Sequence, residues 1–287
     1  MARAGLCHQG TRFRRCIKER HTMNPLVRNE AFESSRRGTL TVWHRTGAPS
    51  DDLVRLLEEP GELLKGTSKS ITRKVGPFVV KESSRSWLNL IKYTLRRGRY
   101  RRGWHAAQHL EAHGVGIPRT LGFIERGGFG FVYGNALVFE YLEGARSVEL
   151  FLLALIQRGA GQETLAEYLG ALAEAVNRLT DAGAYHADIS GKNIFTRDGH
   201  TFYFIDLDDV TLDEPYDEAR RLKNHVQLYD SFCDVLSDSL LFPFIQRMLP
   251  PEINPRVWMP KVRKGQQQRR IEHAERNPGA HRPLLPE

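Results

Sequence analysis

The segment Tyr185–Phe195, which reads YHADISGKNIF, limits what this chain can fold into more than any other. It places His186, Asp188 and Asn193 in the spacing His-x-Asp-x4-Asn, and Asp206 ends a later apolar run. A stretch with helical periodicity precedes the segment, and two short strand-like runs surround the turn after it. The pattern therefore predicts a polar loop between a helix and a β-hairpin, which gathers two carboxylates and an amide.

Phosphoryl transfer needs side chains of this kind, because a base or orienting group must face the acceptor hydroxyl and divalent ions must neutralise the phosphates. Asp188 and Asn193 lie on one loop and can face the acceptor and a metal, while Asp206 can complete the metal site. Magnesium prefers such oxygen ligands. The arrangement is typical of protein-kinase-like phosphotransferases. In the alternative reading, Asp188 is a turn residue, Asn193 a cap and Asp206 a strand-end carboxylate. That reading requires these three residues to occur in this order and spacing by chance.

A lysine for the nucleotide phosphates is expected on a strand of the first half of the chain. Lys81 fits, because it ends the apolar run Val79-Val80. The preceding hairpin over 65–75 lacks the pattern G-x-G-x-x-G, but its small and hydroxylated residues allow backbone N–H groups to approach phosphate. A lysine on the surface of a strand is the alternative reading of Lys81.

The fold class predicted is α+β, with a small, mostly antiparallel sheet followed by helices. Strands are expected at 39–43, 70–75, 78–81, 121–124 and 136–141, and helices at 51–59 and 104–113. The second half predicts helices at 148–157, 163–182 and 216–247, and a strand pair at 194–196 and 202–207. The helix at 163–182 carries a stripe expected to be buried, Leu165, Leu169, Leu172, Val176 and Leu179. Regular structure is expected to end at Pro250, Pro251, Pro255 and Pro260.

Composition excludes several classes of protein. No run reaches 18 apolar residues, so a membrane-spanning helix is not expected. The three cysteines, Cys7, Cys16 and Cys233, form neither a disulfide framework nor a zinc pattern, which predicts a reducing, cytoplasmic location. The net charge of +8 is concentrated in 1–22 and 261–287, which are either solvated tails or attracted to an anionic surface. Met23 offers a second start of the chain.

A third basic stretch, 83–102, carries seven Arg and Lys residues and no acid. Aromatic residues are interleaved with these charges, namely Trp87, Tyr93 and Tyr100, with Trp104 just beyond. Clustered cations contribute about 1 kcal/mol each at an anionic membrane. The region Arg96–Arg102 therefore predicts peripheral contact with such a surface, and the aromatic rings are expected at headgroup level. A basic face on a packed lobe is the alternative, and nucleic acid is the less favoured partner.

Over about residues 62–245 the chain resembles the lipopolysaccharide core kinases, bacterial enzymes of the protein-kinase-like superfamily that phosphorylate Kdo or heptose of the inner core. The resemblance rests on four blocks, 65–81, 99–118, 185–209 and 220–232. Only about ten residues separate Asp206 from the helix expected near Tyr216, and no Ala-Pro-Glu motif ends an activation segment. A small-molecule or glycan acceptor is therefore favoured over a peptide.

The resemblance implies a two-lobed protein-kinase-like fold and divides the chain accordingly. A basic N-terminal tail is expected at 1–35, and an N-lobe with the nucleotide hairpin and hinge at 36–144. A helical C-lobe with the catalytic and metal-binding loops is expected at 145–255, and a basic C-terminal tail at 256–287.

It also implies roles for individual residues. Lys81 would hold the phosphates of ATP, Asp188 would orient or deprotonate the acceptor hydroxyl, and Asn193 and Asp206 would bind Mg²⁺. Lys192 would either reach the transferred phosphate or lie in solvent.

The hinge would be Val138–Gly144, whose backbone, around Glu140, would bind adenine. His186 would brace the catalytic loop. A metal role and a capping role are both open for Asp208 and Asp209.

One departure from the family pattern concerns the helix after the basic stretch. The family has a glutamate just before the tryptophan of this helix, which pairs with the strand lysine, and here that position is Gly103. Glu111, two turns along, could replace it only if the helix shifted. Either another acid pairs with Lys81, or the enzyme is slow, or the fold has lost catalysis.

The function expected is transfer of the γ-phosphate of ATP, with Mg²⁺, to a sugar hydroxyl of the lipopolysaccharide core or a related glycolipid. The chain would then work in the cytoplasm, at the inner face of the cell membrane. Two alternatives stay open from the sequence. One is a small-molecule kinase of the aminoglycoside or choline type or an atypical protein kinase, and the other is a pseudokinase scaffold.

Overall fold

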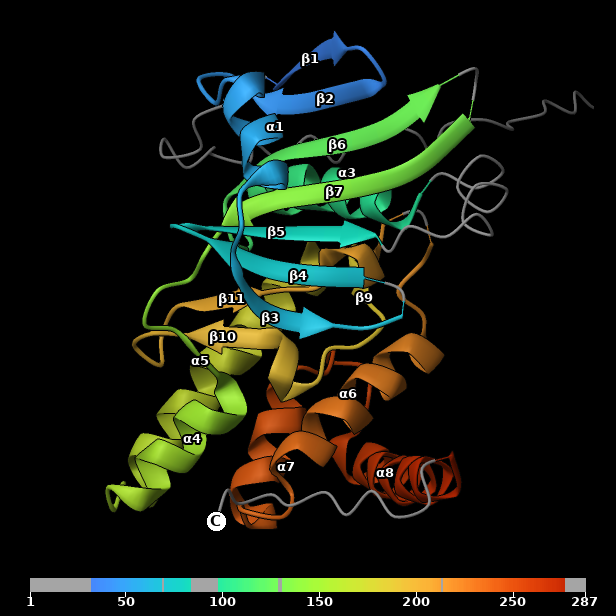
Figure 1. Ribbon diagram of the computed structural model, residues 1–287. Coiled ribbons are helices and arrows are strands. Elements are labelled where there is room, and N and C mark those ends of the chain that lie inside the picture. Colours follow the sequence, from blue (N-terminus) through green and yellow to red (C-terminus); the bar gives the residue numbers. More distant parts are fainter. Residues whose placement is uncertain (1–31, 69, 84–97, 129–130, 213, 277–287) are drawn as a thin grey trace, which may run out of the picture.

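The computed structural model of the protein describes residues 32–68, 70–83, 98–128, 131–212 and 214–276. A sheet forms one end of the molecule and a group of helices the other, and the chain passes from sheet to helices after strand β7 (Phe131–Glu140) (Figure 1). The α+β fold with a small antiparallel N-lobe and a mainly helical C-lobe, predicted from the sequence, is confirmed.

Seven antiparallel strands form the N-lobe sheet, in the spatial order β1-β2-β6-β7-β5-β4-β3. The other strands are β1 (Phe32–Arg37), β2 (Leu40–Arg45), β3 (Glu62–Gly66), β4 (Ser70–Val75), β5 (Phe78–Ser83) and β6 (Thr120–Gly128). Helix α1 (Ser50–Glu58) packs its buried leucines Leu53, Leu56 and Leu57 into the core of this sheet. Strand β1 pairs with β2 and begins at Phe32, so the last residues of the segment predicted as an N-terminal tail, 1–35, belong to the sheet.

The hairpin of β4 and β5 places Lys81 in the middle of the sheet. Its turn contains Gly76, whose φ of +56° lies in the left-handed region that glycine adopts without strain. Lys81 lies opposite Thr72 on β4 and Leu137 on β7, so sheet neighbours flank it on both sides. The side chain is 11% exposed, which contradicts the reading of Lys81 as a surface residue.

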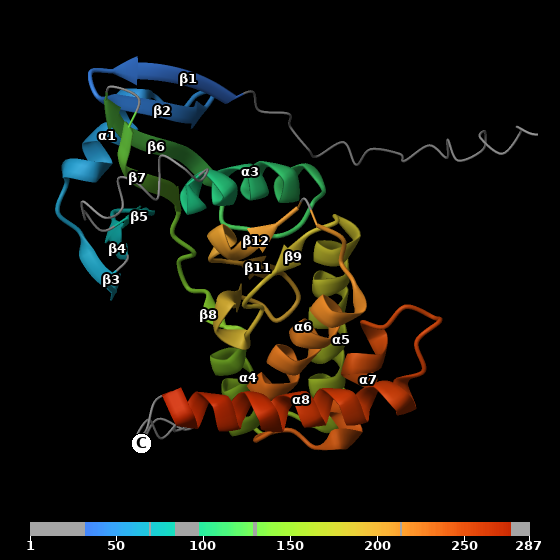
Figure 2. The same cartoon turned by 90° about the vertical axis from the view of Figure 1, so that its right-hand side faces the viewer.

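Helix α3 (Arg99–Ala112) lies between the sheet and the C-lobe (Figure 2). It contacts β6 and β7 on one side, and on the other the short helix η2 (Leu207–Asp209) and strand β12 (Val210–Thr211). The helix begins at Arg99, ahead of the predicted start at Trp104. Because α3 touches both lobes, its N-terminal turns reach the loop that carries Asp206.

The C-lobe packs around the central helix α5 (Gln162–Asp181), whose predicted leucine and valine stripe is buried. Before the catalytic loop lie β8 (Arg146–Ser147), α4 (Val148–Gln157) and β9 (Tyr185–His186). After it come η1 (Gly191–Asn193), β10 (Ile194–Thr196), β11 (Phe202–Phe204), α6 (Glu218–Phe232), α7 (Asp238–Arg247) and α8 (Pro255–Arg276). None of the helices in the described part of the chain combines the length and the apolar composition of a membrane span.

Three further predicted boundaries are wrong. The helix expected over 216–247 is broken into α6 and α7, and the strand expected over 202–207 ends at Phe204 because Asp206 turns the backbone with a φ of +57°. The prolines do not end regular structure, since α8 occupies much of the predicted C-terminal tail. Pro255 is the first residue of α8, where the missing N–H costs nothing, and Trp258, Met259 and Val262 are buried.

Candidate active site

A cleft of about 500 Å³ lies between the two lobes. Its lining includes six residues that the sequence analysis assigned to catalysis or binding, namely Lys81, Glu140, Asp188, Lys192, Asn193 and Asp206. Apolar side chains such as Val79, Phe139 and Leu142 form the part of the wall near the hinge. The cleft therefore joins an apolar end, suited to a flat ring, to a charged end.

The catalytic loop is held by hydrogen bonds inside the predicted motif. Asn193 Nδ2 donates to the carbonyl oxygen of Asp188 at 2.9 Å and to its Oδ2 at 3.0 Å. His186 is fully buried, and its Nδ1 accepts from the backbone N–H of Asp188 while its Nε2 donates to the carbonyl of Ile205. His186 thus ties the loop to the residue before Asp206, a bracing position in agreement with the prediction.

Helix α6 holds the same loop through hydrogen bonds from three buried polar side chains. Asn224 donates to the carbonyl of His186, Gln227 bonds both the carbonyl of Ala187 and the N–H of Ile189, and Ser231 accepts from the N–H of Gly191. Buried backbone groups need such partners. The sequence reasoning missed these residues. A polar set at spacings of three and four within an otherwise apolar helix face was the available signal.

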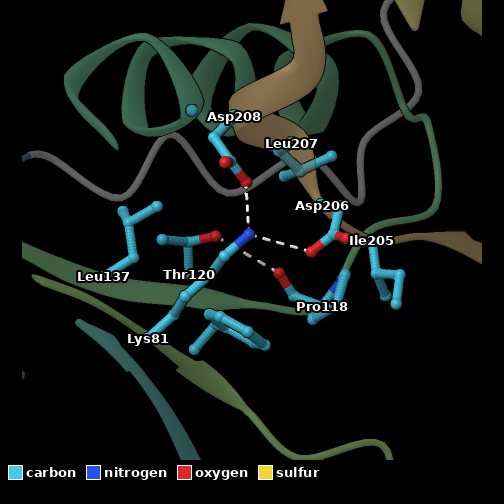
Figure 3. A pocket seen from close by; sticks show the side chains of 10 residues that line it. Lys81, Pro118, Thr120, Leu137, Ile205, Asp206, Leu207 and Asp208 are labelled. Atoms are coloured by element: carbon cyan, nitrogen blue, oxygen red, sulfur yellow. Dashed lines mark hydrogen bonds and ion pairs between the residues drawn. The ribbon is translucent and has the colours of Figure 1, made fainter. Parts of the chain in front are cut away.

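Lys81 forms the centre of a buried charge cluster (Figure 3). Its Nζ lies 2.9 Å from Asp206 Oδ1 and 2.5 Å from Asp208 Oδ1. Burial alone would lower the pKa of Lys81, but the two carboxylates raise it above its ordinary value. Burial likewise would raise the pKa of Asp206, but Lys81, with smaller contributions from Lys65 and His186, lowers it. Both groups are therefore held in their charged forms.

The acid that pairs with Lys81 from outside the predicted motif is Asp208, not a residue of α3. Glu111 is engaged elsewhere, since its Oε2 lies 2.5 Å from Nη2 of Arg45. Asp208 also binds Arg99, whose Nε lies 2.5 Å from Asp208 Oδ2. Of the three outcomes that the absence of a glutamate at Gly103 left open, the geometry agrees with pairing to another acid.

The residues at the charged end suit a magnesium ion. Asp206 offers a carboxylate in the cleft, and the amide oxygen of Asn193 takes no part in the bonds to Asp188. One carboxylate and one amide oxygen fit a cation that takes its remaining ligands from phosphate and water, as Mg²⁺ does. Within the described residues, no group of three or more His, Cys, Asp and Glu side chains could hold a metal alone.

Two hinge N–H groups beside the cleft are already bonded within the protein. The N–H of Glu140 bonds the carbonyl of Arg119, and that of Tyr141 bonds the carbonyl of Pro77. The N–H of Leu142, which also lines the cleft, has no hydrogen-bond partner in the part of the chain that the structure describes. Leu142 is therefore the hinge residue best suited to bind a ring nitrogen.

The predicted membrane patch Arg96–Arg102 is largely a structural element in its described part. Arg99 pairs with carboxylates of the C-lobe, and Arg101 binds both oxygens of Glu125, at 3.0 and 2.7 Å. Tyr100 and Trp104 are 4% and 3% exposed, so the prediction that they lie at headgroup level is wrong. Arg99 and Arg101, which seemed uncompensated in the sequence, are therefore neutralised by acids distant in the chain. Of the three described arginines of this region, Arg102 is the one that is exposed and has no paired acid. Other members of the predicted stretch lie outside the described residues, namely Arg85, Trp87, Lys92, Tyr93, Arg96 and Arg97.

Comparison with known proteins bears on the fold and the family of the chain. A solved structure of WaaP in complex with acyl carrier protein has the same fold, with a TM-score of 0.59 and 18% sequence identity over 76% of this chain and 92% of that chain. A crystal structure of WbdD is more distant, with a TM-score of 0.45 and 16% identity over 77% of this chain and 48% of that one. No curated protein sequence matches the chain. The profile of the lipopolysaccharide kinase (Kdo/WaaP) family matches residues 78–244, more than half of the sequence, and the chain therefore belongs to this family.

Proposed function

We propose that the protein transfers the γ-phosphate of ATP to a hydroxyl group of a sugar in the lipopolysaccharide inner core or a closely related glycolipid. The observation that carries the proposal is the cleft, where Lys81 of the N-lobe sheet meets Asp188, Asn193 and Asp206 of the C-lobe. Membership of a lipopolysaccharide kinase family supports the same reaction class.

Each residue has a role that its position supports. Lys81, which is fixed by two carboxylates, would bind the phosphates of the nucleotide. Lys65 belongs to the glycine-poor hairpin, and its Nζ lies 4.0 Å from Asp206 Oδ2. A lysine there can supply positive charge where a glycine-rich loop would supply backbone N–H groups. Leu142 would bind the adenine ring through its backbone N–H.

Asp188 would orient the acceptor hydroxyl and accept its proton, while the oxygen of that hydroxyl attacks the γ-phosphorus and ADP leaves. Asp206 and Asn193 would hold Mg²⁺, which when bound neutralises the phosphate oxygens. Lys192 is exposed at the mouth of the cleft, where it can approach the transferred phosphate.

An acidic sugar acceptor suits the surface next to the catalytic loop. Tyr185 of β9 and Tyr216 lie with ring centroids 6.3 Å apart, and Arg221 lies 4.8 Å from the centroid of Tyr216. Lys223 is exposed nearby, 5.9 Å from the centroid of Tyr185. Tyr185 is 7% exposed, so the cations rather than the rings are available to a ligand, and cations attract carboxylate and phosphate groups. These residues favour an anionic glycan over the cationic acceptors of aminoglycoside or choline kinases.

A lipid-linked acceptor would bring the protein to the inner face of the cell membrane as a peripheral protein.

The experiment that tests the proposal measures transfer of label from γ-labelled ATP with Mg²⁺. The acceptors are core glycolipids that end in Kdo or in heptose, with an aminoglycoside, choline and a protein as comparators. Label on a core glycolipid, lost in Asp188→Asn, is expected. Label on a comparator alone would overturn the acceptor class, and no transfer to any acceptor would overturn the kinase assignment.

A further inference from the structure

We propose that Asp208, seated against Gly103, is the positioning residue that fixes Lys81 for the nucleotide phosphates, in place of an acid on helix α3. The inference rests on the proposed function, and it concerns how the lysine is held rather than which reaction occurs. Three features of the described residues carry it: the contacts of Asp208, its burial, and the space around Gly103.

Both oxygens of Asp208 are used by cations. Oδ1 lies 2.5 Å from Lys81 Nζ, and Oδ2 lies 2.5 Å from Nε of Arg99 in the first turn of α3. Charge-assisted bonds of this length are the strong class of hydrogen bond in proteins. Asp208 therefore links Lys81 on the sheet, Arg99 on α3 and the loop that follows Asp206.

Burial separates the tasks of the two aspartates. The side chain of Asp206 is 27% exposed and lines the 500 Å³ cleft, so a metal ion can reach it. The side chain of Asp208 is 2% exposed; it lines a cavity of about 30 Å³ next to Lys81 (Figure 3) and is not among the residues that line the cleft. When Asp206 turns its charge toward a metal, Asp208 remains as the counter-charge of Lys81. Asp208 is thus suited to hold the lysine and poorly placed to bind the metal.

Gly103 explains why the acid is on the loop. A Cβ atom at position 103 would lie 3.0 Å from the backbone N of Asp208, 3.1 Å from its Cα and 3.3 Å from its Cβ. These distances are shorter than the ordinary contact of about 3.5–4.0 Å between heavy atoms. A side chain at position 103 of α3 would therefore crowd the backbone that carries Asp208. The absence of a side chain at Gly103 thus leaves room for Asp208 to lie against the helix.

A consequence concerns movement of α3. An acid carried by the helix would leave the lysine whenever the helix moved away, as in kinases regulated through this ion pair. Here the acid belongs to the loop of Asp206, and Arg99 binds α3 to that loop. The lysine therefore keeps its partner as long as the loop itself is in place.

The test compares Asp208→Asn with the matched control Asp209→Asn. Asparagine preserves the shape of the side chain and removes only its charge. Asp209 is the neighbouring acid and also binds Arg99, at 2.7 Å, but no contact joins it to Lys81 in the described residues. The affinity for ATP with Mg²⁺ is measured by calorimetric titration, together with the unfolding midpoint without nucleotide. We expect Asp208→Asn to weaken ATP binding about 10- to 100-fold, since a bond between charged groups is lost, and Asp209→Asn to change it less than about twofold.

A double-mutant cycle adds a readout that a merely structural role would not move. In a Lys81→Met background the Asp208→Asn substitution should weaken ATP binding by less than about twofold, because the residue acts through the lysine. Equal losses in both backgrounds would overturn the inference, as would an Asp208→Asn protein that binds ATP like the Asp209→Asn control. A wild-type protein that binds no ATP would overturn the proposed function itself, and the inference with it.

Discussion

Replacing Gly103 by alanine tests how closely α3 approaches the loop of Asp208. The added methyl group would meet the backbone N and Cα of Asp208 at 3.0 and 3.1 Å, and backbone atoms cannot swing aside as the end of a flexible side chain can. Extra methyl groups in a tightly packed site cost about 1–3 kcal/mol. Alanine in a helix interior is favoured over glycine by about 1 kcal/mol. The free energy of unfolding should therefore fall by about 0–2 kcal/mol.

Gly170 in α5 provides the matched control, because it is also an interior glycine of a helix. A Cβ atom there meets only the guanidinium end of Arg247, an exposed and flexible side chain. Gly170→Ala should therefore keep the gain in helix propensity and raise the free energy of unfolding by up to about 1 kcal/mol. The two substitutions, chemically identical, are expected to differ in sign or at least by about 1 kcal/mol.

Urea unfolding of both variants and of the wild type measures this difference, and calorimetric titration of ATP with Mg²⁺ follows its effect on Lys81. Displacement of Asp208 by the new methyl group should weaken ATP binding in Gly103→Ala and leave it unchanged in Gly170→Ala. The packing argument is refuted if Gly103→Ala is stabilised as much as Gly170→Ala and binds ATP with wild-type affinity.

Three further predictions concern the C-lobe. Asp188→Asn should slow label transfer by about 10²- to 10⁴-fold. The dissociation constant of ATP should change less than threefold. Transfer at the wild-type rate would show that Asp188 takes no part in the reaction. Gln227→Leu should lower the free energy of unfolding by roughly 1–3 kcal/mol in urea, because it leaves buried backbone groups of the catalytic loop unpaired; an unchanged midpoint would contradict this support. Burial, with a smaller effect of Arg221, lowers the pKa of His225 to about 3, so this histidine is neutral when folded and protonated below about pH 6.5 when unfolded. Its contribution to stability is complete above pH 6.5 and should fall by up to about 1.4 kcal/mol per pH unit toward pH 3, a slope that His225→Gln should reduce in acid titrations of stability.

Local signals in the sequence predicted which residues lie together at the cleft and its loop. His186, Asp188 and Asn193 lie within one loop, and Asp206 follows at the end of a short hairpin, so their spacing alone placed them together. Lys81 was predicted because a strand with apolar residues ends in it. All of these residues line the cleft or brace its loop in the structure.

Partners distant in the sequence could not be predicted in this way. Lys81 and Asp208 are separated by 127 positions, and no periodicity reports such a contact. Arg99 and Arg101 looked like uncompensated charges for the same reason, since their acids come from other elements. An ion pair between two elements forms only when the fold packs them together. The composition of a window of twenty residues does not report such packing.

Helix α8 was missed for a different reason. Its prolines predicted a break, and its charged residues predicted a solvated tail. Pro255 stands at the first helical position, where proline is favoured, and Asn254 Oδ1 accepts a bond from the N–H of Arg256. Trp258 then anchors the helix, since its Nε1 donates to Nδ1 of His225 at 2.8 Å in the core of the C-lobe.

The most direct test of the proposed site is thermal unfolding with ATP, with Mg²⁺, with both and with neither, for the wild type and for Asp206→Asn. Nucleotide at about 100 times its dissociation constant stabilises a protein by roughly 2.7 kcal/mol. The wild type should show a shift of its unfolding midpoint that requires ATP and Mg²⁺ together, and Asp206→Asn should lose the part that depends on Mg²⁺. A wild type without any shift, or a variant that keeps the full magnesium-dependent shift, would contradict the assignment of this cleft as a magnesium–nucleotide site.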